Sequence, residues 1–150
     1  MKKIICTMLT AIMTLSMVAC GGAKKTVTLT YEEAGMSCEY TMDAKGDAVK
    51  KITQVTTIDT SQFTSDILAS LETTLEETKS MADGVDCVTY TVEQTETAYI
   101  ETIILDVSSS DNIEEISDSG IMQLDVNEAD YISLEKTTEN MESMGFTVAE

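Results

Sequence analysis

Residues 40–59, with the sequence YTMDAKGDAVKKITQVTTID, decide the fold that we expect of this chain. Apolar side chains alternate with polar ones just before this stretch and at its start. The apolar positions are Met36, Cys38, Tyr40 and Met42. Such alternation is typical of a strand with one buried face. Residues 43–47 follow as a loop in which Gly46 is free to adopt a positive φ. Residues 48–58 are rich in Val, Ile and Thr, so they predict the second arm of a β-hairpin.

The segments on either side of this hairpin extend the pattern. An earlier strand is predicted by apolar residues that alternate with Thr: Val27, Leu29 and Tyr31. A turn at Gly35 separates that strand from the hairpin. After the hairpin, residues 64–66 offer N-cap side chains for a helix that ends near Gly84. The apolar residues of this helix recur at helical spacing, at Leu68, Leu71, Leu75 and Ala82.

The middle of the chain predicts two further strands and a loop. Residues 85–93 and 97–107 alternate as the first strands do. The later of these strands is apolar on both faces, because Ile100 and Ile104 lie opposite the other apolar residues, so we expect it inside the sheet. Residues 108–120 are rich in Ser, Asp and Asn and predict a loop with a short helical turn over 113–116.

A last helix is predicted between Ser133, as its N-cap, and Gly145, just beyond its end. Three apolar residues are expected on its inward side: Leu134, Met141 and Met144. The order of elements is therefore strands, helix, strands, helix, which predicts the α+β class. We expect a single domain over residues 26–150, with an antiparallel β-sheet of about five strands packed with two amphipathic helices.

The N-terminus has the order of an export signal followed by an anchor point. A positively charged start and an apolar run precede a small residue, Cys20 and two glycines. This order resembles a bacterial lipoprotein signal, in which a diacylglyceryl group is attached to the cysteine and the chain is cut before it. An ordinary signal peptide or a transmembrane anchor is the alternative, although the run at 4–19 is shorter than the ~20 apolar residues that span a bilayer. We assign residues 1–19 to the signal peptide and 20–25 to a lipidated tether.

Charge limits the partners of the mature chain. Once the two lysines of the signal are removed, seven lysines and no arginine face 27 acidic residues, a formal net charge of −20. Such a charge repels nucleic acid and anionic lipid headgroups. We therefore expect no nucleic-acid partner. Composition also suggests that the lipid alone, and no basic patch, attaches the chain to the membrane.

The residue types that are absent exclude several kinds of chemistry. Without His there is no His-based catalytic pair and no His-ligated zinc or haem. Neither a glycine-rich phosphate loop nor a GxSxG elbow occurs. We therefore expect no enzyme activity, no catalytic residue, no cofactor and no metal. Acid-rich segments at 106–115 and 125–130 leave a Ca²⁺ binder as a lesser alternative, since neither segment has EF-hand spacing.

Two cysteines remain in the predicted exported domain, Cys38 and Cys87. An even pair in an exported protein is a candidate disulfide, and two separate buried thiols are the alternative. The alternation argues against the bridge, because Cys38 shares the face of Tyr40 whereas Cys87 lies opposite the face of Val88. If both apolar faces meet the same core, the two thiols point apart.

Three segments carry a resemblance to a known family. They are the hairpin at 40–59, the segment ASLETTLEETKSMADGVDCVTYTVEQTETAYIETIILDV at 69–107, and SLEKTTENMESMGFTV at 133–148. Together with the lipoprotein cysteine and Gly21, they resemble the YehR-like lipoproteins, a bacterial family of unknown function. The likeness covers nearly the whole mature chain. It implies a compact α+β lipoprotein and supplies no activity and no catalytic residues.

These observations predict a lipoprotein anchored to the cell membrane on its extracytoplasmic face. Its partner is the membrane itself, reached through the lipid on Cys20. We expect the domain to be a non-catalytic module that binds a small ligand, a peptide or an envelope protein. A structural or accessory envelope protein that meets another protein through a sheet face is the alternative. A concave apolar pocket would favour the binding module, and a flat apolar patch the accessory protein.

Overall fold

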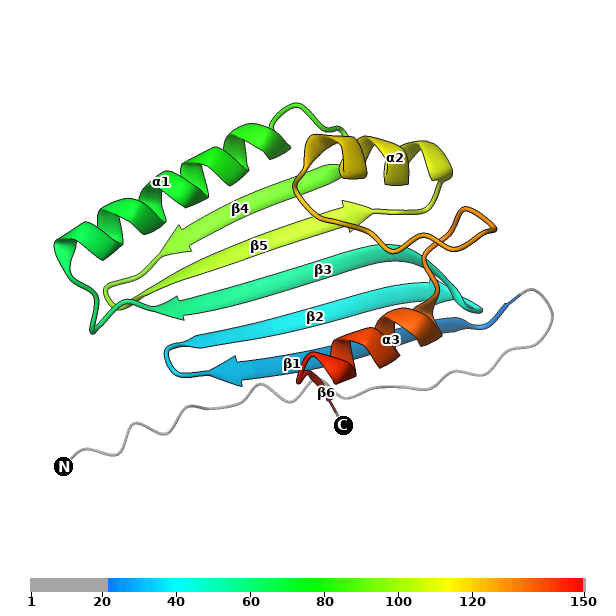
Figure 1. Cartoon of the computed structure of the whole chain (residues 1–150), viewed down its shortest axis with the longest axis horizontal. Coiled ribbons are helices and arrows are strands. Elements are labelled where there is room, and N and C mark those ends of the chain that lie inside the picture. The colour runs from blue at the N-terminus through cyan, green and yellow to red at the C-terminus, as the bar shows by residue number, and fades with distance from the viewer. Residues whose placement is uncertain (1–21, 150) are drawn as a thin grey trace.

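The computed structural model of the protein describes residues 22–149. It contains six strands and three helices (Figure 1). In chain order they are β1 (Lys24–Glu33), β2 (Met36–Lys45), β3 (Ala48–Asp59), α1 (Ser65–Ala82), β4 (Val88–Gln94), β5 (Ala98–Asp106), α2 (Ser110–Ser119), α3 (Leu134–Ser143) and β6 (Thr147–Val148). Cys20 and the predicted signal peptide lie outside the described residues.

The strands form one antiparallel sheet in the order β4-β5-β3-β2-β1-β6. The predicted hairpin is β2 and β3, joined by a turn in which Gly46 has a φ of 67°. Because β5 pairs with β3, β4 forms one edge of the sheet, and β6 closes the other edge beside β1. The expected α+β class with an antiparallel sheet is confirmed. The sheet has six strands instead of about five, since the two-residue β6 is too short to leave an alternating pattern.

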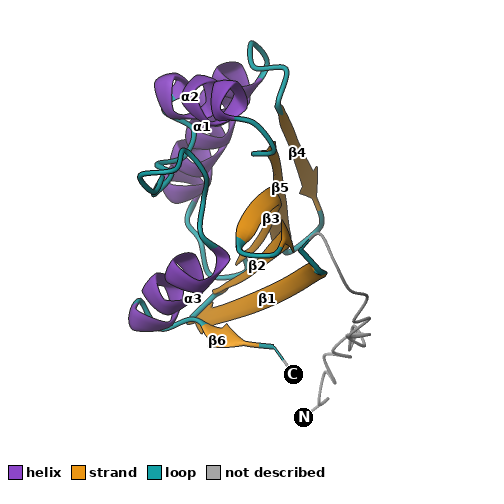
Figure 2. Cartoon of the chain, turned by 90° about the vertical axis from the view of Figure 1, so that its right-hand side faces the viewer, coloured by secondary structure: helices purple, strands orange, loops and turns teal. Residues whose placement is uncertain are grey.

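All three helices pack on the same face of the sheet (Figure 2). The core lies between these two layers and is best developed at the end where β1 begins. There the register aligns Met42, Ile52 and Leu105 in one row across the sheet, each no more than 1% exposed. The helical layer closes this core with four buried side chains: Ile113, Ile116, Ile132 and Leu134.

Residues 110–119 form a complete helix, α2, where the sequence predicts a loop with a single helical turn. The Ser109 side chain caps it by accepting a hydrogen bond from the Asn112 N–H, and Gly120 ends it with a φ of 76°. Ile113 and Ile116 lie three residues apart and are buried against the sheet. The polar composition is typical of a loop, but packing of these two side chains stabilises the helix.

The other two helices begin where their caps predict. Thr64 is the N-cap of α1 and Ser133 is the N-cap of α3. The expectation that Met144 packs inward is wrong, because the helix ends at Ser143 and Met144, as its C-cap, is 61% exposed. Phe146 packs at this position in its place, with its ring 5.2 Å from the ring of Tyr31.

The second face of the sheet carries no helix within residues 22–149 (Figure 2). Because side chains alternate along a strand, this face takes the residues between the core positions. Most of them are hydroxyl residues: Thr26, Thr28, Thr30, Ser37, Thr41, Thr53, Thr57, Thr89, Thr91 and Thr102. Among them lie three half-buried aliphatic residues, Val55, Ile100 and Ile104. We call this surface the threonine face.

The candidate disulfide between Cys38 and Cys87 is not formed, and both thiols are free. Cys38 lies in β2 and Cys87 precedes β4, with β3 and β5 between them. Three strand spacings of ~4.8 Å exceed the ~7 Å that a disulfide allows between Cα atoms. The thiols also have different neighbours, since Cys38 lies 3.9 Å from the Thr56 hydroxyl whereas Cys87 contacts α2.

Candidate functional site

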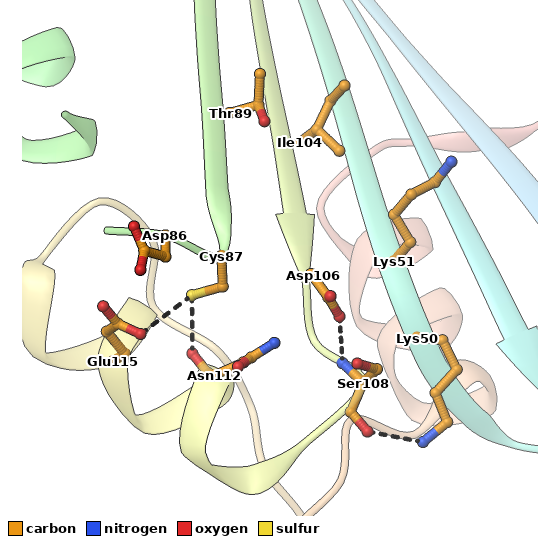
Figure 3. Close-up of a pocket in the computed structure, with 10 residues that line it drawn as sticks. All are labelled: Lys50, Lys51, Asp86, Cys87, Thr89, Ile104, Asp106, Ser108, Asn112 and Glu115. Carbon is orange, nitrogen blue, oxygen red and sulfur yellow. Dashed lines mark hydrogen bonds between the residues drawn. The ribbon is translucent and has the colours of Figure 1, made fainter. Parts of the chain in front are cut away.

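An open pocket of about 490 Å³ lies beside α2, at the end of the sheet where β3 begins and β5 ends (Figure 3). Ten residues line it: Lys50, Lys51, Asp86, Cys87, Thr89, Ile104, Asp106, Ser108, Asn112 and Glu115. They belong to β3, to β4 and the residues just before it, to β5 and the loop that follows it, and to α2. Only the folded chain brings them together.

The register of the sheet and the turn of α2 explain why these residues meet. Two cross-strand pairs contribute to the wall formed by the sheet: Thr89 with Ile104, and Lys51 with Asp106. Asn112 and Glu115 are three residues apart on α2, so their side chains lie on neighbouring positions of one helix face. Cys87, just before β4, lies between the sheet and the helix and contacts both Asn112 and Glu115.

The Cys87 thiol is held as a hydrogen-bond donor. Its Sγ lies 3.6 Å from the Asn112 carbonyl oxygen and 3.7 Å from Glu115 Oε2. Burial, followed by the charge of Glu115, raises the pKa of this thiol above its ordinary value. Because the thiolate is the reactive form, a raised pKa makes Cys87 a poor nucleophile at neutral pH.

Four of the five charged side chains of the pocket are divided by sign, and the fifth, Asp106, is the cross-strand partner of Lys51. Lys50 and Lys51 stand on one side, and Asp86 and Glu115 stand on the other (Figure 3). Lys51 Nζ lies 3.1 Å from an oxygen of Asp43 in an ion pair that is about half exposed. The pocket therefore presents two positive groups on one side and two negative groups on the other.

The loop after β5 is fixed by backbone contacts to these charges. Lys50 Nζ donates to the Ser108 carbonyl at 3.3 Å, and Asp106 accepts from the Ser108 N–H at 3.0 Å. Hydrogen bonding from the Ser108 side chain and backbone lowers the pKa of Asp106. Asp106 is thus ionised at neutral pH, and its hydrogen bond fixes the residues that precede α2.

A second polar group lies on the helix side of the sheet, and the sequence analysis does not predict it. Tyr90 donates to Glu101 and Tyr99 donates to Glu72 of α1, each at 2.7 Å. Burial is the main cause that raises the pKa of Tyr90, and the hydrogen bond to Glu101 raises it further. The available signal is Glu101 itself, a charged residue on the core-facing side of a strand that is otherwise apolar there.

The residues singled out from the sequence are distributed over different places. Cys87 lies in the pocket, and Cys38 lies on the helix side of β2. The acid-rich segment 106–115 contributes Asp106 and Glu115 to the pocket, whereas 125–130 lies elsewhere. Within the part of the chain that the structure describes, no three Cys, Asp or Glu side chains converge as metal ligands would.

Between residues 22 and 149, no helix is both long enough and apolar enough to pass through a membrane.

A family described as proteins of unknown function, DUF1307, matches residues 25–147 of the chain. The chain belongs to this family. An uncharacterized lipoprotein of Listeria monocytogenes is 28% identical over 151 residues, which cover 97% of this chain and 95% of that protein. DUF1307 therefore includes most of the length that the sequence analysis assigned to one domain.

Two solved structures share the fold. The E. coli YehR protein aligns with a TM-score of 0.65 and 17% identity over 86% of this chain and 93% of its own. A protein from Streptococcus pneumoniae TIGR4 aligns with a TM-score of 0.57 and 13% identity over 98% of each chain. The resemblance to the YehR-like family is confirmed.

Proposed function

We propose that this DUF1307 protein is a non-catalytic binding module, held by a lipid on Cys20 at the extracytoplasmic face of the cell membrane. The signal-like order before Cys20 supports the anchor, as does the lipoprotein of Listeria monocytogenes that matches along nearly its whole length. β1 begins at Lys24, so a lipid on Cys20 would hold the fold directly against the bilayer.

The observation that carries the binding role is the separation of charge across the pocket. Lysines 50 and 51 on one side suit a carboxylate, while Asp86 and Glu115 on the other suit an ammonium group (Figure 3). Thr89 and Asn112 add hydrogen-bonding groups between them. A small zwitterion, such as a free amino acid or a dipeptide, satisfies both sides at once.

The directions in which the fold shifts its pKa values support a role without catalysis. The pKa of the Cys87 thiol is raised, as described above, and burial also raises the pKa of Cys38. The shifted carboxyl groups within residues 22–149 all have a lowered pKa: Asp43, Asp47, Asp59 and Asp106. A general acid at neutral pH needs the opposite shift, so none of these groups is prepared for that task.

Binding is tested by NMR on the isotope-labelled protein in detergent, with glycine and glycylglycine as probes. We expect amide shifts at 86–89 and 108–115, with a Kd on the order of 1 mM. Lys50→Gln and Glu115→Gln should each weaken binding about fivefold, because each removes one charge-assisted contact. Matched changes on α3, Lys136→Gln and Glu139→Gln, should leave binding unchanged. Absence of shifts with either probe at about ten times that concentration contradicts the assignment.

The threonine face favours a second function, that of an accessory protein which meets an envelope partner. Val55, Ile100 and Ile104 make a half-buried apolar strip on a face that no helix covers within the described residues. Thr102→Lys, at its centre, should reduce crosslinking to such a partner in cells and leave glycylglycine binding intact. Loss of both would mean that the variant is misfolded, which circular dichroism checks.

A further inference from the structure

The lysines are unevenly distributed over the fold. Seven follow the predicted signal, and five of these lie at strand ends: Lys24, Lys25, Lys45, Lys50 and Lys51. These are the strand ends where β1 begins, β2 ends and β3 begins. The other two, in the last turn of α1 and the first turn of α3, lie toward the same end. The opposite turns, β1–β2 and β4–β5, carry Glu33 and Glu96 and no lysine.

The chain enters the fold at this same end. Gly46 donates its backbone N–H to the Ala23 carbonyl at 2.9 Å. Gly22 has a φ of 69°, and a Cβ there would lie 3.2 Å from the Gly46 nitrogen, so the entering chain passes closely beside the β2–β3 turn. Only Gly21 lies between Gly22 and Cys20, so these two residues are two chain steps apart, a reach of at most ~7 Å.

Two of these lysines face each other although the fold gains nothing from it. Lys24 and Lys45 are directly opposite in the β1–β2 register, and both are exposed. Like charges opposite each other on neighbouring strands are destabilising. The chain has 27 acidic residues, any of which at either position would remove this repulsion. A like-charged pair at the point of chain entry suggests a negatively charged partner outside the fold.

The acidic residues near this pair have other hydrogen-bond partners. Asp43 accepts from Thr26 and pairs with Lys51, which is the one ion pair within residues 22–149. Asp47 accepts from the Glu135 N–H and the Tyr131 hydroxyl. Lys24, Lys25 and Lys45 therefore have no carboxylate within ion-pair distance in the described part of the chain.

We propose that Lys24, Lys25 and Lys45, the tether-end lysines, rest on anionic phospholipid headgroups of the bilayer that holds Cys20; this inference rests on the proposed lipid anchor. A chain of net charge −20 is otherwise repelled by such a surface. Gly22 lies beside these lysines, because a Cβ there would lie 3.3 Å from Lys45 Cγ, and the acidic β1–β2 and β4–β5 turns lie at the other end of the sheet. The charge of the whole chain predicts no basic patch, yet the fold gathers its few lysines where they meet the membrane.

The test is a footprint of lysine reactivity on the lipidated full-length protein. The protein is reconstituted in vesicles of phosphatidylcholine alone or with about 30% phosphatidylglycerol. Amines are acetylated by a water-soluble ester and quantified by mass spectrometry. We expect the tether-end lysines to react at least about threefold more slowly on the anionic vesicles, and about 0.5 M salt to remove the difference. Lys79 lies on α1, over the β4 edge of the sheet, and is the internal control whose reactivity should not change.

A matched pair of variants separates position from net charge. Lys24→Gln with Lys45→Gln should abolish the protection of Lys25 on anionic vesicles. Lys79→Glu changes the net charge by the same two units, far from the tether at the β4 edge of the sheet, and should leave that protection intact. If the first variant does not fold, the salt dependence of the wild-type footprint still decides the question.

Flotation separates failure of the anchor from failure of the docking. If the protein floats with both kinds of vesicle and the tether-end lysines react equally on both, the docking proposal is overturned and the anchor stands. If it floats only with anionic vesicles and the lysines are protected there, the anchor proposal fails and docking stands. Equal protection by soluble polyphosphate at physiological salt, without vesicles, would assign the lysines to a free polyanion and also overturn the proposal.

Discussion

The two faces of the sheet are made by the same strands, yet they differ in almost every physical property. On the helix side, Leu29, Met42 and Leu105 are completely buried. On the threonine face, the alternate positions stay partly exposed. Threonine is β-branched and favours strands whichever way it faces, while it exposes little apolar area. The helix side therefore supplies most of the folding energy, and the threonine face is free for contacts outside the domain.

The faces also differ in how their ionisable groups respond to the fold. On the helix side, burial raises the pKa of Tyr40 to about 12, and the pKa of Tyr90 is also raised. On the threonine face, Asp43 has a lowered pKa: burial opposes the shift, but hydrogen bonds from Thr26 and Lys51 outweigh it. Hydrogen bonds from Ser108 act in the same direction on Asp106. The stability contributed by the helix-side tyrosines should therefore be lost at high pH, and that contributed by the aspartates of the threonine face at low pH.

The largest expected effect contrasts two positions of β5. Leu105→Ala on the helix side should lower the free energy of unfolding by about 2–5 kcal/mol, because Leu105 is 0% exposed and its removal leaves a cavity. Thr102→Ala on the threonine face should cost less than about 1 kcal/mol, the span of strand propensity. Urea unfolding followed by circular dichroism measures both. Equal losses would mean that the threonine face is packed against something in solution.

A pH series should separate the faces by their titrating groups. The tyrosines have raised pKa values in the fold, so their contribution is complete below pH 10.0 and is lost as the pH rises through the folded values. The aspartates have lowered values, so their contribution is present above pH 3.8 and is lost as the pH falls through the folded values.

Thermal unfolding across this range is the measurement for the two limbs. In a plot of melting temperature against pH, Tyr90→Phe should reduce only the fall at alkaline pH, and Asp43→Asn should reduce only the fall at acid pH. If Asp43→Asn altered the alkaline limb instead, the assignment of these groups to separate faces would fail.

A smaller effect is expected at α2, which covers one end of the helix side. Ser109→Ala removes the side chain that accepts from the Asn112 N–H, so the free energy of unfolding should fall by about 1 kcal/mol. Ser119→Ala, at the other end of the same helix, is the control, and we expect a smaller loss. No change for Ser109→Ala would show that packing of α2 makes its cap dispensable.

The smallest effect concerns the threonine face at the tether end. Lys45→Glu converts the repulsive Lys24–Lys45 pair into an attractive one, so the free energy of unfolding should rise by about 0.2–1 kcal/mol. The same change should weaken the docking on anionic vesicles. A variant that lost both stability and docking would argue that the lysine pair serves the fold itself.

The positions of the strands along the chain are what the sequence predicts best. The alternation around Tyr40 and Ile103 places every long strand and identifies which face is buried. The order of strands in the sheet does not follow from alternation, because a period of two says nothing about neighbours. The pocket does not follow from alternation either, because its walls depend on α2. This short polar helix is stabilised by the packing of Ile113 and Ile116. The sequence makes Cys87 a candidate for a bridge to Cys38, and in the fold Cys87 lies instead against α2.

The close approach of Gly22 to Gly46 has a consequence for how the domain meets other molecules. If Cys20 carries the proposed lipid, the domain would turn and diffuse with that lipid and would not reach far into the surrounding medium. Its search for partners would then be two-dimensional, along the plane of the membrane. Ligands released at the bilayer surface, or proteins that diffuse in the same leaflet, would meet it far more often than molecules dispersed in bulk solution.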